Sequence, residues 1–288
     1  MKIRVLTDSG GLMSQQQAHQ YDIDYLPLQV TIGEKTYMDG IDLSTAVLYD
    51  EIEKGLMPQT SQPPMGFVEE LFDSYNEQGV TDVILITLSS GLSGTNNNVY
   101  LCGMRHDIKV HTLDIYSTLG MEKFMALFAK ELVDQEVDPE EIIRRLKVCV
   151  EYSAGYLIVE DLDHLCRGGR LTPMAAKLGG MLKIKPILEV SKRTEGRVDI
   201  YEKVRTMSKA VKKACKIITG NEYINAQDYL IVLMDSRAPE NAQIAEETLR
   251  KAFPDIEIVR DDICAVIAAH TGLKAVGIQF VRKAEGIK

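Results

Sequence analysis

The chain has 288 residues, of which 45% are hydrophobic, and it carries a net charge of −9 at pH 7. This length exceeds what one hydrophobic core usually covers and fits two α/β domains of ordinary size. The acidic balance argues against general nucleic-acid binding, and the lack of a long apolar run or a signal-like start argues against membrane insertion and export.

The first part of the chain is predicted to alternate strands with helices. A strand over 2–7 ends at the polar turn Asp8-Ser9-Gly10-Gly11. The pattern then predicts a helix over 14–21, a strand over 23–32, an extended segment over 35–38 and a helix over 44–54.

Residues 57–64 are rich in proline and are predicted to lack regular structure. A helix is expected to follow Pro64 and to end at Gly79. Thr60 and Ser61 therefore lie on a stiffened loop that enters a helix. Ser61 could be only the N-cap of that helix, but two adjacent hydroxyls, where one cap suffices, leave a ligand-binding role open.

The centre of the chain is a buried strand over 83–88 followed by a turn rich in hydroxyl groups, Ser89-Ser90-Gly91-Leu92-Ser93-Gly94-Thr95. The carboxyl end of a parallel strand and the amino end of the next helix are where α/β proteins bind anionic ligands. Ser93 or Thr95 could instead simply cap the helix. The four hydroxyls of this turn favour a ligand site.

The chain changes character near Ser153. Up to this point, a strand over 108–114 and helices over 117–134 and 139–152 complete a βαβα pattern, which predicts a parallel sheet. Beyond it, two strands over 184–190 and 197–205 are close enough to pair antiparallel. We therefore expect a mostly parallel, Rossmann-like domain with flanking helices over 1–153 and a mixed α/β domain over 154–288, with a ligand between them. The rest of the second domain is predicted as strand 156–159, helices 162–166, 208–218 and 240–252, strands 229–234 and 256–259, a short helix before His270 and strand 275–281.

Basic residues are concentrated in residues 167–216, which contain 14 Lys and Arg against four acidic residues. This asymmetry is compatible with a solvated surface, and equally with a docking surface for an acidic partner or an anionic membrane. The five cysteines are widely spaced and form no C-x-x-C pair, which predicts neither a disulfide framework nor a zinc site and favours a cytoplasmic location.

Five segments, in this order and over the whole chain, resemble the DegV family: Thr60-Ser61-Gln62-Pro63, Ser89-Ser90-Gly91-Leu92-Ser93-Gly94-Thr95, Gly168-Gly169-Arg170, Ile184-Lys185-Pro186-Ile187-Leu188 and His270-Thr271-Gly272. The resemblance implies a two-domain α/β protein that buries a long-chain, palmitate-like fatty acid between its domains. It also implies the role of the fatty-acid-binding subunit of bacterial fatty acid kinase, whose partner subunit phosphorylates the bound carboxylate with ATP for phospholipid synthesis.

The same resemblance implies which residues form the site. The fatty acid carboxylate would lie near Thr60, Ser61, Ser93, Gly94, Thr95 and His270. Arg170 and Arg205 would contact the head group or the kinase. No metal or cofactor is expected. Because the sequence has no nucleotide-binding glycine motif, ATP would belong to the partner, and the chain alone would be a carrier without catalytic activity.

Two other functions are compatible with the sequence. Ser93 and His270, with Asp235 as a third member, occur in the chain order of a serine hydrolase acting on an acyl ester, although the Ser93 segment lacks the second glycine of G-x-S-x-G. A fold-level analogy to the substrate-binding part of dihydroxyacetone kinases would instead give His270 a small carbonyl substrate.

Overall fold

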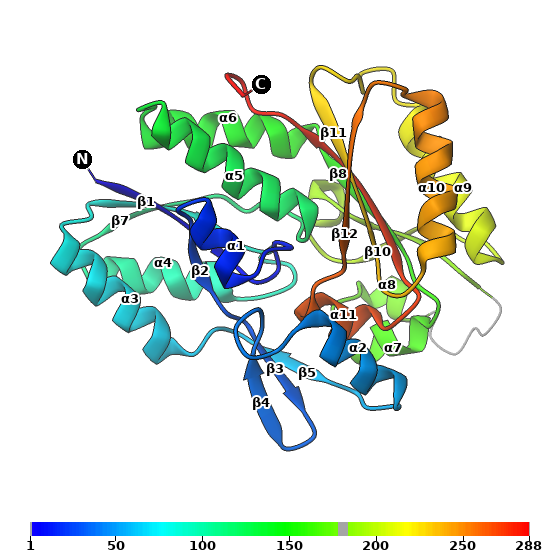
Figure 1. Cartoon of the computed structure of the whole chain (residues 1–288), viewed down its shortest axis with the longest axis horizontal. Helices are drawn as coiled ribbons and strands as arrows, with labels where there is room; N and C mark the ends of the chain where they lie inside the picture. The colour runs from blue at the N-terminus through cyan, green and yellow to red at the C-terminus, as the bar shows by residue number, and fades with distance from the viewer. Residues whose placement is uncertain (1, 178–183, 288) are drawn as a thin grey trace.

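The computed structural model describes residues 2–177 and 184–287, and within them the chain forms an α/β fold with strands in three sheets (Figure 1). The predicted fold class is confirmed. Of the basic residues in 167–216, Lys183 lies outside the described residues. In the described part of the chain, no helix is long and apolar enough to cross a membrane.

The N-terminal half contains the predicted parallel sheet. Its strand order is β2-β1-β6-β7, and every neighbouring pair is parallel. Strand β6 (Asp82–Ile86) is buried along its whole length, as its continuous apolar run predicts. The strands are β1 (Ile3–Asp8), β2 (Asp24–Leu26), β6 (Asp82–Ile86) and β7 (Lys109–Thr112).

Helices cover both faces of this sheet. On one face, α3 (Met65–Gln78) and α4 (Thr95–Arg105) bury an apolar cluster that includes Phe72 and Val99. On the other face lie α5 (Gly120–Asp134) and α6 (Pro139–Glu151). The predicted start of α6 is confirmed, because Asp138 caps it and Pro139 occupies its first turn.

The C-terminal half forms a mixed sheet of six strands in the order β10-β9-β8-β13-β11-β12. The predicted antiparallel pairing of residues 184–190 with 197–205 is confirmed by β9 and β10. The strands are β8 (Ala154–Ile158), β9 (Ile187–Val190), β10 (Asp199–Glu202), β11 (Tyr229–Asp235), β12 (Glu257–Asp262) and β13 (Val276–Arg282).

The mixed sheet has one face toward α9 (Met207–Thr219) and α10 (Pro239–Ala252) and the other toward α5 and α6. Because α5 contacts both β1 and β13, it lies between the two large sheets, and one hydrophobic core extends from the first sheet to the second (Figure 1). The predicted boundary at residue 153 falls between α6 and β8, and the division into two domains stays a prediction.

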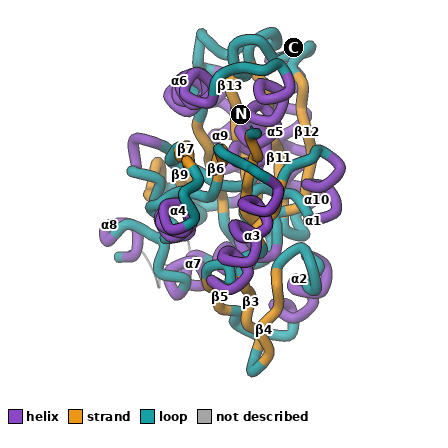
Figure 2. Tube along the Cα trace, turned by 90° about the vertical axis from the view of Figure 1, so that its left-hand side faces the viewer, coloured by secondary structure: helices purple, strands orange, loops and turns teal. Residues whose placement is uncertain are grey.

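A small antiparallel sheet, in the order β4-β3-β5, projects from the lower side of the molecule beside α2 (Figures 1 and 2). Two predictions are wrong here. The single strand over 23–32 is interrupted at Pro27, so that β2 joins the parallel sheet and β3 the small one. Residues 59–61, predicted as irregular, form the edge strand β5, because these three residues between prolines keep the N–H groups that pair with β3. The elements are β3 (Gln29–Ile32), β4 (Lys35–Met38), β5 (Gln59–Ser61) and α2 (Thr45–Glu53).

The remaining helices are short. They are α1 (Gln15–Gln20), α7 (Leu162–Arg167), α8 (Pro173–Ala176), the 3-10 turn η1 (Lys192–Thr194) and α11 (Ala265–Thr271). Helix α11 packs against β3, β5, α2 and α7 and carries His270 into the region where the sheets meet.

Candidate functional site

A cavity of about 390 Å³ lies between the sheets, within the range of small-molecule sites. Most of its wall is apolar and comes from elements that are far apart in the sequence. The apolar lining residues are Leu28, Leu88, Leu92, Leu119, Tyr156, Leu157, Leu165, Val190, Val198, Met234, Val266 and Ile267. Such a wall is suited to a flexible apolar ligand rather than to a charged one.

Polar side chains of the cavity include Thr60 on β5 and His270 on α11. The Thr60 hydroxyl lies 2.7 Å from Nε2 of His270, a contact between residues 210 positions apart. The other ring nitrogen of His270, Nδ1, is buried and has no hydrogen-bond partner in residues 2–177 and 184–287. Pairing of β5 with β3 fixes the position of Thr60, opposite Val30.

The His270 imidazole is neutral at pH 7. Burial, with smaller contributions from the positive charge of Arg170 and from the neighbouring His164, lowers its pKa to about 4. Gly168 packs against this ring so closely that a Cβ there would lie 2.5 Å from Nδ1. His270 therefore offers hydrogen bonding to a ligand without adding a positive charge.

The turn after β6 brings a second set of hydroxyls to the cavity. Ser93 lines it, and the Ser93 hydroxyl lies 2.8 Å from that of Thr95 and accepts a bond from the Thr95 N–H at 3.3 Å. Helix α4 has Gly94 at its N-cap position, with no side-chain cap. The interpretation of Ser93 or Thr95 as a conventional cap is therefore not supported, and Ser61 does not cap α3 either, whose N-cap is Pro64.

Arg170 is a charged residue of the cavity wall. Its guanidinium donates to the carbonyl oxygens of Gly168 at 2.6 Å and Leu92 at 3.5 Å, and it forms no ion pair with any carboxylate in the part of the chain that the structure describes. A partly buried guanidinium bonded only to carbonyls is well placed to attract a ligand anion.

The predicted site residues are thus largely brought together. Thr60, Ser61, Ser93, Gly94, Arg170 and His270 all line the cavity. Thr95 is buried behind Ser93 and positions it. Arg205 is exposed and does not line the cavity, so a head-group contact is not available to it here, and a contact with a partner stays a prediction.

Sequence reasoning missed several polar residues of the wall, among them Gln62, Thr118 and Gln279. Gln62 accepts from the Asn98 side chain at 2.6 Å and so links the β5 segment to α4. Gln279 bonds the Met121 N–H at 2.9 Å and the Thr118 carbonyl at 2.9 Å, fixing the start of α5 on β13. A glutamine inside an otherwise apolar strand was the signal that could have identified Gln279.

The geometry of a serine hydrolase is not assembled. Nε2 of His270 faces Thr60, and among the described residues Nδ1 has no hydrogen-bond partner, acidic or otherwise. The Asp235 carboxylate instead accepts from the Ala238 N–H at 2.7 Å and lies 3.4 Å from Arg260. The three groups therefore do not form the relay that nucleophilic activation requires.

Comparison with known proteins identifies the family. Residues 2–283 match the family model described as "Uncharacterised protein, DegV family". This chain belongs to the DegV family. It is 35% identical to protein DegV of Bacillus subtilis over 283 residues, which cover 96% of this chain and 98% of that protein.

Solved structures agree with this assignment. A crystal structure of DegV from Bacillus subtilis, described as a fatty acid binding protein, is 33% identical, with a TM-score of 0.87 over 98% of this chain and 100% of the other. The B3 protein of the Streptococcus pneumoniae fatty acid kinase, loaded with linoleic acid, is 18% identical, with a TM-score of 0.81 over 98% of this chain and 99% of the other. At that identity the second likeness shows a shared fold alone.

Proposed function

We propose that this DegV-family protein binds a long-chain fatty acid in the cavity between its sheets. The observation that carries the proposal is the composition of the wall: a large apolar lining from both halves of the chain, interrupted by Thr60, Ser93, a neutral His270 and an Arg170 that has no acidic partner among the described residues. The fatty acid bound by the Bacillus subtilis relative supports the same ligand class.

The apolar wall supplies the affinity. A sixteen-carbon acid buries about 14 methylene groups, worth on the order of 11 kcal/mol at ~0.8 kcal/mol each before the costs of ordering are subtracted. The polar groups need only to orient the carboxylate. The protein therefore binds its ligand chiefly by the tail and positions it by the head.

The carboxylate would lie near Thr60, Ser61, Ser93, Gly94, Thr95 and His270. Hydroxyl donors and the N–H groups at the start of α4 can hold an anion by charge-assisted hydrogen bonds. A tight ion pair on both oxygens would lower their nucleophilicity, whereas neutral donors leave an oxygen able to attack a phosphoryl group. Arg170, at the edge of this group, would attract the anion or its phosphorylated product.

The chain would act as a carrier whose bound lipid is phosphorylated by a separate kinase subunit in the cytoplasm. The sequence contains no phosphate-binding motif of its own for ATP, which supports a separate kinase subunit. The exposed lysines of α9, together with Arg205, would provide the contact to the partner or to an anionic membrane.

The proposal is tested by the double substitution Thr60→Ala with Ser93→Ala. Loss of two hydrogen bonds to a charged group should weaken fatty acid binding by roughly 100-fold or more, since each such bond contributes about 1.5–3 kcal/mol. Binding is measured by displacement of a fluorescent fatty acid, and the fold by circular dichroism.

A matched control is the pair Ser74→Ala with Thr248→Ala, because both hydroxyls bond only a carbonyl of their own helix, each at 2.7 Å. The control should bind as the wild type does. Equal affinities in the wild type and the Thr60/Ser93 variant would remove these hydroxyls from the head-group site.

A further inference from the structure

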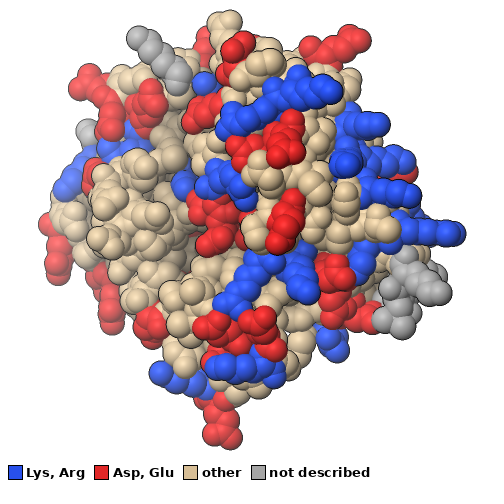
Figure 3. Space-filling view, turned by 45° about the vertical axis from the view of Figure 1, so that its right-hand side comes forward, with Lys and Arg blue, Asp and Glu red and all other residues tan. Residues whose placement is uncertain are grey.

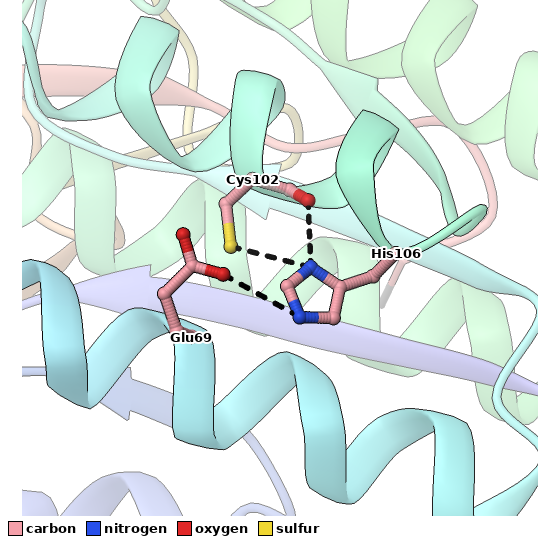
Figure 4. A group of neighbouring side chains, drawn as sticks. All are labelled: Glu69, Cys102 and His106. Carbon is pink, nitrogen blue, oxygen red and sulfur yellow. Dashed lines mark hydrogen bonds and ion pairs between the residues drawn. The ribbon is translucent and has the colours of Figure 1, made fainter.

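A cluster of potential metal ligands lies outside the cavity, between α3 and α4. One ligand atom each of Glu69, Cys102 and His106 lies within 4.8 Å of the other two (Figure 4). Asp73, one turn beyond Glu69 on α3, adds a second carboxylate beside the same imidazole. Each helix thus contributes an i, i+4 pair, which places both members on one face.

The imidazole of His106 is oriented as metal-binding histidines are. Its Nδ1 lies 2.9 Å from the carbonyl oxygen of Cys102, so the Nδ1–H donates to its own helix. The imidazole of His106 also packs against the Phe72 ring, with the two ring centroids 5.7 Å apart, and this contact restricts the orientation of the imidazole plane. This leaves Nε2 directed toward the carboxylates of Glu69 and Asp73, where it can share a cation with them.

The distances favour a metal. Nε2 of His106 lies 3.2 Å from Oδ1 of Asp73 and 3.5 Å from Oε2 of Glu69. Two ligands at about 2.1 Å from a tetrahedral zinc ion lie about 3.4 Å apart, whereas a charge-assisted hydrogen bond is about 2.8 Å long. The ligand atoms are therefore separated by about the spacing that one small cation would impose.

The residues around the cluster are also arranged as they are around bound metal ions. Arg105 pairs with Oε1 of Glu69 and leaves Oε2 directed at the imidazole. Such a partner on the far oxygen of a ligating carboxylate is a usual feature of metal sites. Cys102 is buried, and its sulfur lies 3.7 Å from Nδ1 of His106, beside the Glu69 carboxylate in Figure 4.

We propose that Glu69, Asp73, Cys102 and His106 form a binding site for a divalent zinc-type metal ion. Imidazole nitrogen, thiolate sulfur and carboxylate oxygen are all ligands that zinc accepts, and four protein side chains would complete a tetrahedral site. Binding would replace the Cys102 thiol proton, which is released to solvent.

The role of this metal follows from the segments that precede α3 and α4 in the chain. Helix α3 follows the β5 segment with Thr60 and Ser61, and α4 begins at Thr95, directly after Ser93 and Gly94. A metal that joins α3 to α4 would hold together the two segments that bring hydroxyls to the cavity. The site is therefore structural, and it does not depend on which ligand the cavity holds.

The test uses the full-length protein, stripped with a chelator and titrated with ZnCl₂ against a competing chromogenic chelator. We expect one tightly bound zinc per chain and a rise in melting temperature with zinc concentration. His106→Gln and Glu69→Gln should each weaken binding by roughly 10- to 100-fold or more. Glu69→Gln is the safer variant, because this side chain is 38% exposed and its loss should not prevent folding.

His19→Gln and Cys149→Ser are the matched controls, since both residues lie outside the cluster, and they should bind zinc as the wild type does. With CoCl₂ in place of zinc, a thiolate-to-cobalt absorption band that is lost in Cys102→Ser is expected. Absence of stoichiometric zinc binding, or binding that survives both His106→Gln and Glu69→Gln, would overturn the site. A cobalt complex without that band would overturn the assignment of Cys102 as a ligand.

Discussion

The contact between Thr60 and His270 shows what a single residue contributes at this site. The hydrogen bond uses Nε2, burial keeps the ring neutral, and Nδ1 is left without a partner in the described part of the chain. A protonated His270 beside Arg170 would be disfavoured both by desolvation and by repulsion. Burial therefore favours the neutral form of this ring, which still forms its hydrogen bond to Thr60.

This arrangement predicts a pH dependence of stability. The unfolded state binds the His270 proton near pH 6.5 and the folded state only near pH 4, so the free energy of unfolding should decrease as the pH falls from about 6.5 to about 4. His270→Gln should reduce that decrease by on the order of 2 kcal/mol between pH 7 and pH 5. Urea denaturation at both pH values measures it.

Asp8 has the opposite effect on the free energy of unfolding. Burial raises its pKa to about 6, so protonation of Asp8 stabilises the folded state as the pH falls. The comparison is therefore made between wild type and variant at each pH, where the Asp8 contribution cancels. His19→Gln, an exposed histidine, serves as the control and should leave the pH dependence as it is. If the free energy of unfolding changed with pH by the same amount in the wild type and in His270→Gln, the lowered pKa of this ring would be contradicted.

Individual site residues could be predicted from the sequence to the extent that they belong to local motifs. Ser93 and Thr60 stood out as hydroxyls in turns next to strands, and both line the cavity. The partner of His270 could not be found in this way, because it lies 210 positions away. Periodicity and capping report on neighbours within a turn or two, not on which loops meet.

At the scale of the elements, the turn after β6 is held by the hairpin turn between η1 and β10. A Cβ on Gly91 would lie 2.5 Å from the Glu195 carbonyl oxygen, and a Cβ on Gly196 would overlap the Ser89 side chain. The two turns therefore meet backbone to backbone. Through this contact the C-terminal half fixes the hydroxyl-bearing turn of the N-terminal half.

Gly196→Ala should disrupt this contact. Gly196 has φ +68°, which costs an alanine about 1 kcal/mol, and the overlap with Ser89 should add about 1–3 kcal/mol of destabilisation and weaken fatty acid binding. Gly33→Ala is the matched control, since Gly33 has φ +63° but open space around it, so only the backbone cost applies. Thermal unfolding of both variants gives the comparison, and equal losses of stability would contradict the packing described.

The elements themselves were largely predictable, and the failures have physical causes. Caps and apolar periodicity located helices such as α3 and α6 well. Strand β5 was missed because three residues between prolines carry no periodicity, and they pair only because β3 offers a free edge. The proposed metal site departs from the sequence prediction that no metal would bind, because nothing in the sequence shows that the faces of α3 and α4 meet.

At the scale of the molecule, the βαβ pattern of the sequence predicted the parallel sheet, whereas no sequence pattern predicted the strand order of the mixed sheet. Strand β13, the last in the chain, lies between β8 and β11. Such pairing between distant segments leaves no local signal. The cavity is a consequence of that order, since its wall combines β8, β9, β11 and β13 with the turns of the first half.

The charge distribution is also a property of the whole molecule. Figure 3 shows Lys and Arg side chains gathered on the right-hand part of one face. On α9, Lys209, Lys212, Lys213 and Lys216 are all exposed along one side of the helix, opposite its buried side. A basic face of this kind suits the kinase subunit or the anionic membrane that the proposed function requires.

Lys212→Glu combined with Lys213→Glu should weaken binding to vesicles of anionic phospholipid by about tenfold or more at low salt, since each Lys near such a surface contributes about 1 kcal/mol. Co-sedimentation at two salt concentrations measures it. Lys35→Glu with Lys147→Glu changes the net charge equally on other exposed lysines and should have a smaller effect. Binding that does not depend on salt, or equal losses in both variants, would contradict a docking role for α9.

The central claim, that the cavity holds a long-chain fatty acid, is tested most directly by native mass spectrometry of the protein purified without added lipid. The released molecule is then identified after denaturation. We predict a stoichiometric mass increase that matches a long-chain fatty acid and disappears on denaturation. A mass equal to that of the chain alone, unchanged after incubation with mixed fatty acids, would contradict the account.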